Sequence, residues 1–196
     1  IGSAQGSSYG FAGTFDGAGH KITDYSGSKN GLFEYCEGSS DTDRAVIKDV
    51  ELYGSSTGQN ACGIAMKAKN TDISGCVSYC TVKGTTSGGH TASILGYAYG
   101  NCSVIDCVNY AEIRGTGNVG GIVGELNVTS TVDRCINKGN VFCLNTGGNN
   151  IGGLIGSLNG QMYRSANYGN IRAYGRNIGG IAGQSVAAKA VIDSCC

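Results

Sequence analysis

The stretch Asn150-Ile-Gly-Gly-Leu-Ile-Gly156 decides the fold, because the chain contains it three times with the same glycines. Asn118-Val-Gly-Gly-Ile-Val-Gly124 precedes it and Asn177-Ile-Gly-Gly-Ile-Ala-Gly183 follows it, at a spacing of roughly 30 residues. Self-similarity at a fixed period of this size is typical of solenoids and other repeat architectures. The three copies therefore predict a fold built from stacked, equivalent units.

A second segment, with Asn at its third position, precedes each glycine-rich copy. Its copies are Cys107-Val-Asn-Tyr-Ala-Glu-Ile113, Cys135-Ile-Asn-Lys-Gly-Asn-Val141 and Ser165-Ala-Asn-Tyr-Gly-Asn-Ile171. A degenerate copy comes earlier, with Cys76-Val-Ser-Tyr-Cys-Thr-Val82 and then Ser93-Ile-Leu-Gly96, and Val50-Glu-Leu52 and Gly31-Leu-Phe33 belong to weaker copies. The array therefore covers nearly the whole chain.

Composition and patterning favour β structure. The 196 residues include 35 glycines but no proline or tryptophan, and 40% are hydrophobic against 14% charged, which excludes collagen, a proline-rich linker and a disordered chain. Short β-branched segments recur, at 103–105, 112–113 and 119–123, and no window has a helical period with caps. A unit with two or three such strands cannot bury its own apolar face, so copies must stack. We predict a right-handed parallel β-helix of about six coils, with residues 1–44 as an opening coil and 45–196 as one continuous solenoid.

Stacking would turn equivalent positions into columns along the axis, and three of these columns are aliphatic. They are Ile64, Ile94, Ile122, Leu154 and Ile181; Val82, Ile113, Val141 and Ile171; and Ile73, Val104, Val132, Met162 and Ile192. We predict that they form the core, and that Gly121, Gly153 and Gly180 turn corners or allow close backbone approach.

These motifs resemble the GLUG-type repeats of bacterial surface proteins. Gly153-Leu-Ile-Gly156, Gly121-Ile-Val-Gly124 and Gly180-Ile-Ala-Gly183 look like the core of that repeat, and Phe11 to Ile22 is similar to an opening coil. Glu34 and Met66 depart from it, because they stand where the repeat has its final glycine. The resemblance implies a β-solenoid on exported bacterial proteins, including adhesin stalks and certain immunoglobulin A peptidases, and it brings no catalytic residues. It agrees with a chain that starts at Ile1 without Met and stops in mid-repeat, as a mature product or a segment of a longer protein would.

The net charge does not indicate a class of binding partner. Fourteen basic residues match fourteen acidic ones, which removes the usual electrostatic basis for binding nucleic acid, and no apolar run is long enough for a membrane span. We therefore expect neither nucleic acid nor membrane insertion, and no cofactor.

Catalytic motifs are sparse. His20 and His90 do not lie in a zinc peptidase pattern, and we expect a structural or exposed role for each, His90 in a loop. Asp106 shares a register with Arg134 and Arg164, which predicts a partly exposed ion-pair ladder, with a lyase-like site as the alternative. Asp133 and Asp193 share another column, but Tyr163 separates them. A carbohydrate-active enzyme of the β-helix class is therefore the second hypothesis for function.

Cysteines form one small-residue column, made of Cys76, Cys107, Cys135 and Cys195 with Ser165 and Val50 in the remaining places. We favour buried free thiols, which pack as small hydrophobes, over disulfide bonds between neighbouring coils. The spacing does not resemble a zinc site, and we expect no metal.

Two polar columns complete the pattern. Asn109, Asn137 and Asn167 predict a ladder of stacked amides that donate and accept hydrogen bonds along the axis at a turn between strands. Tyr79, Tyr110, Lys138 and Tyr168 should point to solvent, where aromatic rows can stack on sugar rings or anchor a protein. We interpret the chain as a non-catalytic, secreted or cell-surface spacer or adhesive module that contacts glycan or host protein through these four residues. Ice binding is a third hypothesis, but Thr85, Thr86, Thr129 and Thr131 do not repeat from coil to coil.

Overall fold

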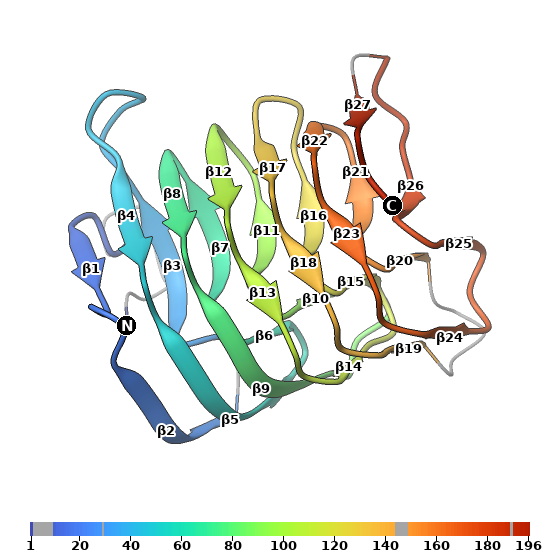
Figure 1. The fold of residues 1–196 in the computed structure, drawn as a ribbon, viewed down its shortest axis with the longest axis horizontal. Coiled ribbons are helices and arrows are strands. Elements are labelled where there is room, and N and C mark those ends of the chain that lie inside the picture. Colours follow the sequence, from blue (N-terminus) through green and yellow to red (C-terminus); the bar gives the residue numbers. More distant parts are fainter. Residues whose placement is uncertain (2–9, 29, 144–148, 189) are drawn as a thin grey trace.

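The structure, a computed structural model, describes residues 1, 10–28, 30–143, 149–188 and 190–196. The described residues contain strands and no helix, and the chain winds into a parallel β-solenoid whose two ends carry the two termini (Figure 1). About six coils are present in this part of the chain, and the winding is right-handed (Figure 1). Residues 2–9 of the expected opening coil lie outside the described residues, and β1 to β3 form the described part of the first coil. The predicted fold is confirmed.

Each full coil passes through four parallel sheets, rather than the two or three strands that the sequence predicted. Sheet 1 contains β1 (Thr14–Asp16), β4 (Ala45–Lys48), β8 (Thr71–Ser74), β12 (Cys102–Ile105), β17 (Thr131–Asp133), β22 (Gln161–Tyr163) and β27 (Val191–Asp193). Sheet 2 contains β2 (Lys21–Gly27), β5 (Glu51–Gly58) and β9 (Val77–Gly84), followed by the paired short strands β13 (Val108–Asn109) and β14 (Ile113–Arg114), β18 (Ile136–Asn137) and β19 (Val141–Cys143), and β23 (Ala166–Asn167) and β24 (Ile171–Ala173).

The remaining two sheets complete the coil. Sheet 3 contains β6 (Ala61–Cys62), β10 (His90–Ala92), β15 (Asn118–Gly120), β20 (Asn150–Gly152) and β25 (Asn177–Gly179). Sheet 4 contains β3 (Phe33–Glu37), β7 (Ala65–Lys69), β11 (Leu95–Ala98), β16 (Val123–Leu126), β21 (Ile155–Leu158) and β26 (Ala182–Gln184). The segment 119–123, expected to be strand, contains the end of β15, a corner at residues 121–122 and the start of β16.

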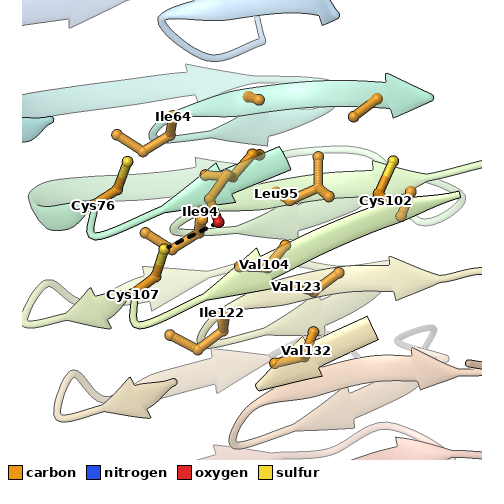
Figure 2. Packing of buried hydrophobic residues seen from close by; sticks show 14 of the residues in the cluster. Ile64, Cys76, Ile94, Leu95, Cys102, Val104, Cys107, Ile122, Val123 and Val132 are labelled. Carbon is orange, nitrogen blue, oxygen red and sulfur yellow. Dashed lines mark hydrogen bonds between the residues drawn. The ribbon is translucent and has the colours of Figure 1, made fainter. Parts of the chain in front are cut away.

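The aliphatic columns lie in the core as predicted. Val104 pairs in register with Ile73 and Val132, and Ile113 pairs with Val82 and Val141. Figure 2 shows Ile64, Ile94 and Ile122 stacked from coil to coil. Burial is complete in the central coils and decreases in the last one, where Ile192 is 51% exposed.

The glycines between sheets 3 and 4 allow close approach. A Cβ atom on Gly153 would overlap the carbonyl oxygen of Gly180 and the side chain of Asn167. A Cβ atom on Gly156 would lie 2.6 Å from the backbone nitrogen of Val119, because the outer faces of sheets 3 and 4 meet there. The prediction of close approach is confirmed for Gly153 and also for Gly121, where a Cβ atom would lie 2.3 Å from the carbonyl oxygen of Gly153. At Gly180 the prediction of close approach is wrong, because a Cβ atom there would meet no described atom within 4 Å, and this glycine lies at the corner between β25 and β26.

A single left-handed residue separates sheet 1 from sheet 2. The φ angles are 54° at Asp49, 62° at Gly75, 54° at Asp106, 51° at Arg134 and 44° at Arg164. Such values are uncommon outside glycine, with Asn and Asp next in preference. The sharp bend turns the following residue inward, and this is the position of the cysteine column.

The amide ladder forms as predicted, with Asn109 and Asn137 buried and Asn167 half-buried. Asn109 donates a hydrogen bond to Oδ1 of Asn137 (2.7 Å), and Asn137 donates one to Oδ1 of Asn167 (2.8 Å). Each amide also donates to the carbonyl oxygen two residues later, at distances between 2.8 and 3.1 Å. These bonds close the bend that divides sheet 2 into two short strands per coil.

Three of the four thiols of the cysteine column are buried as predicted, and Cys195 is half-exposed. Cys76, Cys107 and Cys135 are fully buried and free, and the Cys107 thiol contacts the carbonyl oxygens of Ile105 (3.3 Å) and Ile73 (3.9 Å). Burial raises the pKa of the Cys107 thiol well above its usual range, which suppresses the reactive thiolate.

Thiol reagents should therefore separate two classes of cysteine. In the folded protein we expect labelling of the exposed Cys196 and the half-exposed Cys195, whereas Cys76, Cys107 and Cys135 should react only after denaturation. Mass spectrometry of peptides from labelled samples checks this. Recovery of Cys107 linked to Cys76 or Cys135 under non-reducing conditions would contradict it.

Candidate functional site

The predicted tyrosine column lies on the outer face of sheet 2 and is longer than expected. Tyr53 joins it, because Tyr53 and Tyr79 are partners in register. The rings of Tyr53 and Tyr79 are stacked with centroids 4.5 Å apart, and those of Tyr79 and Tyr110 are 4.8 Å apart, both nearly parallel. We call Tyr53, Tyr79 and Tyr110 the tyrosine ladder.

A lysine covers each end of the tyrosine ladder. Nζ of Lys138 lies 4.8 Å from the ring centroid of Tyr110 and donates a hydrogen bond to its hydroxyl (3.2 Å). Nζ of Lys21 lies 5.4 Å from the ring centroid of Tyr53. The hydrogen bond to Tyr53 and the charge of Glu51 together raise the pKa of Lys21. The tyrosine ladder and its two ammonium groups thus form one continuous row of cation–π and ring contacts.

This stacking determines what the tyrosine ladder can offer to a ligand. The ring faces lie against neighbouring rings or lysines, so the ring edges and hydroxyl groups face solvent. Tyr79 and Tyr110 are 36% and 42% exposed. Tyr168, in the same column beyond Lys138, is 69% exposed and has no ring contact with another described residue. A sugar ring could therefore stack on Tyr168, whereas the tyrosine ladder can contribute hydrogen bonds.

A shallow depression lies beside Tyr53. It is lined by Lys21, Thr23, Asp24, Tyr53 and Gly54. The register between β2 and β5 shifts there, with Asp24 at a φ of 58° and Gly54 at 138°. The depression adds polar groups at the amino-terminal end of the tyrosine ladder.

Sequence reasoning missed Tyr53 and Lys21 for identifiable reasons. Leu52 replaces the Asn of the repeat, which hides the alignment of Tyr53 with Tyr79. Lys21 is the register partner of Glu51 and reaches over Tyr53 from there, but its segment shows no recognisable copy of the repeat in the sequence. The spacing from Val50 to Tyr53, equal to that from Cys76 to Tyr79, was the available signal.

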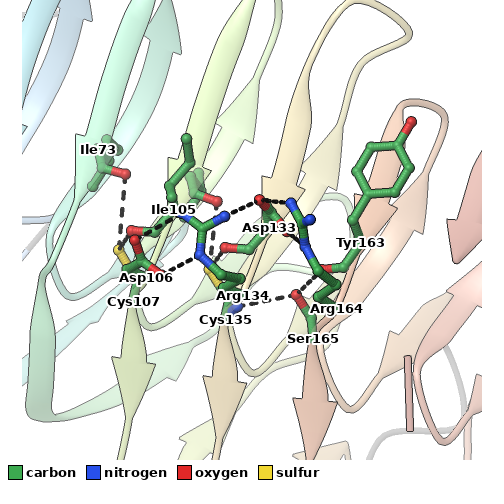
Figure 3. Close-up of polar contacts among 11 residues, drawn as sticks. Ile73, Ile105, Asp106, Cys107, Asp133, Arg134, Cys135, Tyr163, Arg164 and Ser165 are labelled. Atoms are coloured by element: carbon green, nitrogen blue, oxygen red, sulfur yellow. Dashed lines mark hydrogen bonds and ion pairs between the residues drawn. The ribbon is translucent and has the colours of Figure 1, made fainter. Parts of the chain in front are cut away.

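The expected ion-pair ladder is present at the left-handed corner (Figure 3). Arg134 donates two hydrogen bonds to Asp106, at 2.7 and 2.9 Å, and one to Asp133 at 2.6 Å. Arg164 pairs with Asp133 (2.9 and 2.5 Å) rather than extending the Asp106 pair. Hydrogen bonds from Arg134 and from Arg164 lower the pKa values of Asp106 and Asp133, respectively. Both carboxylates are thus held in the ionised form.

His90 differs from the expectation, because it lies in β10 rather than in a loop. Its ring stacks on Tyr97 with centroids 4.8 Å apart, and Nδ1 lies 3.5 Å from Oε2 of Glu125. Burial lowers the pKa of His90, and the neighbouring Glu125 opposes this effect. His20 is exposed as expected. The glycine beside His90 suggested a loop, but the parallel pairing of β10 with β15 overrides that local preference.

The described residues contain no group of three or more His, Cys, Asp or Glu side chains that could hold a metal ion. In the same part of the chain, no helix long and apolar enough to cross a membrane was found.

Comparison with known proteins identifies one similar fold. No family model matches the chain, the GLUG-type repeat included, and no curated protein matches its sequence. A crystal structure described as "a putative immunoglobulin A1 protease" from Bacteroides ovatus matches with a TM-score of 0.71 and 20% sequence identity. The match covers 92% of this chain and 58% of that protein, so this chain spans little more than half of its length. At this identity the similarity supports the β-solenoid fold alone.

Proposed function

We propose that this chain is a non-catalytic module of a secreted or cell-surface bacterial protein, acting as a rigid spacer whose sheet 2 face adheres to glycan or host protein. The observation that carries the proposal is the exposed tyrosine ladder with its lysines and Tyr168. Tyrosine is well suited to such a surface, because it offers a large polar and apolar contact at low entropic cost. The name of the Bacteroides ovatus protein also supports an extracellular setting, since immunoglobulin A1 is a secreted substrate.

The geometry suggests two kinds of contact. Hydroxyl groups of Tyr79 and Tyr110 repeat at about one strand spacing, roughly 4.8 Å, and each can donate and accept a hydrogen bond. Tyr168 adds an exposed ring face for a sugar or an apolar side chain. A ligand lying along the solenoid axis would meet both.

Replacement of Tyr110 and Tyr168 by Ser should weaken binding to mucin glycoprotein or immobilised glycans by about tenfold or more, because hydrogen bonds and ring contacts are lost together. The melting temperature should change little, since both side chains are substantially exposed. Tyr163→Ser is the matched control, because Tyr163 lies on sheet 1. Affinities measured by biolayer interferometry check the prediction.

Enzymatic activity on a polysaccharide would contradict the proposed adhesive function. The alternative is a β-helix polysaccharide lyase or glycoside hydrolase, for which Asp106 and Arg134 are an exposed carboxylate–guanidinium pair. Depolymerisation of a polysaccharide panel by the wild-type chain, abolished in Asp106→Asn, would establish that function. Equal binding by the wild type and the double Tyr variant would also count against adhesion through sheet 2.

A further inference from the structure

A second column runs beside the tyrosine ladder on the exposed side of sheet 2. Strand β9 carries Tyr79, Thr81 and Lys83 on that side. Lys83 pairs in register with Thr57 and Arg114, and the same column continues through Phe142 to Arg172. We call the residues Thr57, Lys83, Arg114, Phe142 and Arg172 the basic column.

The basic column carries an excess of positive charge, although the chain as a whole has no net charge. Lys83, Arg114 and Arg172 are cations, and Lys138 of the tyrosine column adds a fourth to the same sheet. Glu112 lies close by and is paired with Arg114. All fourteen Asp and Glu residues of the chain belong to its described part, and none of them lies within ion-pair distance of Lys83, Lys138 or Arg172.

This arrangement has an electrostatic cost that Glu112 offsets at Arg114 but that no acidic residue offsets at Lys83 or Arg172 in the described part of the chain. Lys83 and Arg114 are direct register partners on neighbouring strands, about 4.8 Å apart, where like charges destabilise a sheet. Arg114 is held in place by Glu112 and by the Phe142 ring, whose centroid lies 4.8 Å from its guanidinium carbon. Lys83 and Arg172 are exposed cations with no such partner among the described residues. A bound anion would relieve this repulsion.

We infer that the sheet 2 face recognises an anionic glycan. In this arrangement sulfate or carboxylate groups of the glycan contact Lys83, Lys138 and Arg172, while its hydroxyl groups bond to Tyr79 and Tyr110. The guanidinium of Arg172 suits both groups, because its planar fork can donate two parallel hydrogen bonds to one anion. The inference rests on the proposed function and narrows it to one class of glycan.

The test uses chondroitin sulfate, hyaluronan and neutral dextran, each immobilised, with the full chain in solution. We expect the chain to bind chondroitin sulfate, with or without binding to hyaluronan. This binding should weaken as the salt concentration rises, because added ions screen exposed charges. The double variant Lys83→Gln/Arg172→Gln should bind roughly tenfold more weakly. The control Lys48→Gln/Lys69→Gln, which removes the same charge from sheets 1 and 4, should bind within about twofold of the wild type.

Three results would overturn the inference. Tyrosine-dependent binding to mucin or neutral dextran that is insensitive to Lys83→Gln/Arg172→Gln would leave the proposed adhesion standing and remove its anionic specificity. Equally tight binding to a DNA homopolymer, reduced by the same variant, would identify a generic polyanion surface. Absence of binding to every glycan and to mucin would remove both the inference and the proposed function.

Discussion

Replacement of Gly153 by Ala should destabilise the protein by about 3 kcal/mol, at the upper end of the range for overpacked cores. The added methyl group would overlap the Gly180 carbonyl oxygen of the next coil and the half-buried Asn167 amide. Both obstacles belong to the hydrogen-bonded framework, so neither can move aside without breaking a bond between coils. Chemical denaturation followed by circular dichroism measures the loss as a lower urea midpoint.

Gly88→Ala is the matched control for this substitution. Gly88 is exposed, has no positive φ, and leaves open space around an added Cβ atom. Its stability should stay within about 0.5 kcal/mol of the wild type or rise slightly, because alanine reduces the entropy of the unfolded chain. If both variants unfold at the same midpoint, close packing at the corner of sheets 3 and 4 is not a determinant of stability.

The core was predictable because stacking in a solenoid converts spacing in sequence into contact in space. Ile94 and Ile122 hold equivalent places in the repeat, so their stacking followed once parallel coils were assumed. The same reasoning placed Asn109 beside Asn137. The contacts of such residues can be predicted without knowing the conformation of the loops between them.

The corners were less predictable, because they depend on backbone conformation. The left-handed residue between sheets 1 and 2 is Asp, Gly or Arg in different coils, and Arg134 has no intrinsic preference for that conformation. Its ion pairs with Asp106 and Asp133, which help to hold it there, exist only after the coils have stacked.

The candidate site was predictable as a column but not as a geometry. Equal spacing put Tyr79, Tyr110 and Tyr168 in one row, but it could not show whether the rings face solvent or each other. Side-chain torsions decide this, and contact with the next ring buries more aromatic surface than an upright orientation would. The hydrogen-bonding edge of the ladder is therefore visible only in the folded structure.

Replacement of Asn137 by Leu should lower the free energy of unfolding by about 4 kcal/mol, which is more than the loss of an exposed hydrogen bond would cause. Asn137 donates to Asn167 and to the Gly139 carbonyl oxygen, and accepts from Asn109 and the Gly139 backbone N–H. Leucine removes one hydrogen-bond partner from each of these four groups. Three of the groups, on Asn109 and Gly139, lie inside the protein, where an unsatisfied donor or acceptor costs about 1–3 kcal/mol. Urea denaturation measures the change in unfolding free energy.

Shape alone cannot account for such a loss, because Leu52 already occupies the equivalent buried place two coils earlier than Asn109. There sheet 2 runs as one unbroken strand, whereas the Asn coils divide it into two. The exposed Asn170→Ala is the control, with an expected change within about 0.5 kcal/mol. An Asn137→Leu variant as stable as this control would mean that the coil reforms as an unbroken strand, and that the amide ladder selects the bend without stabilising the fold.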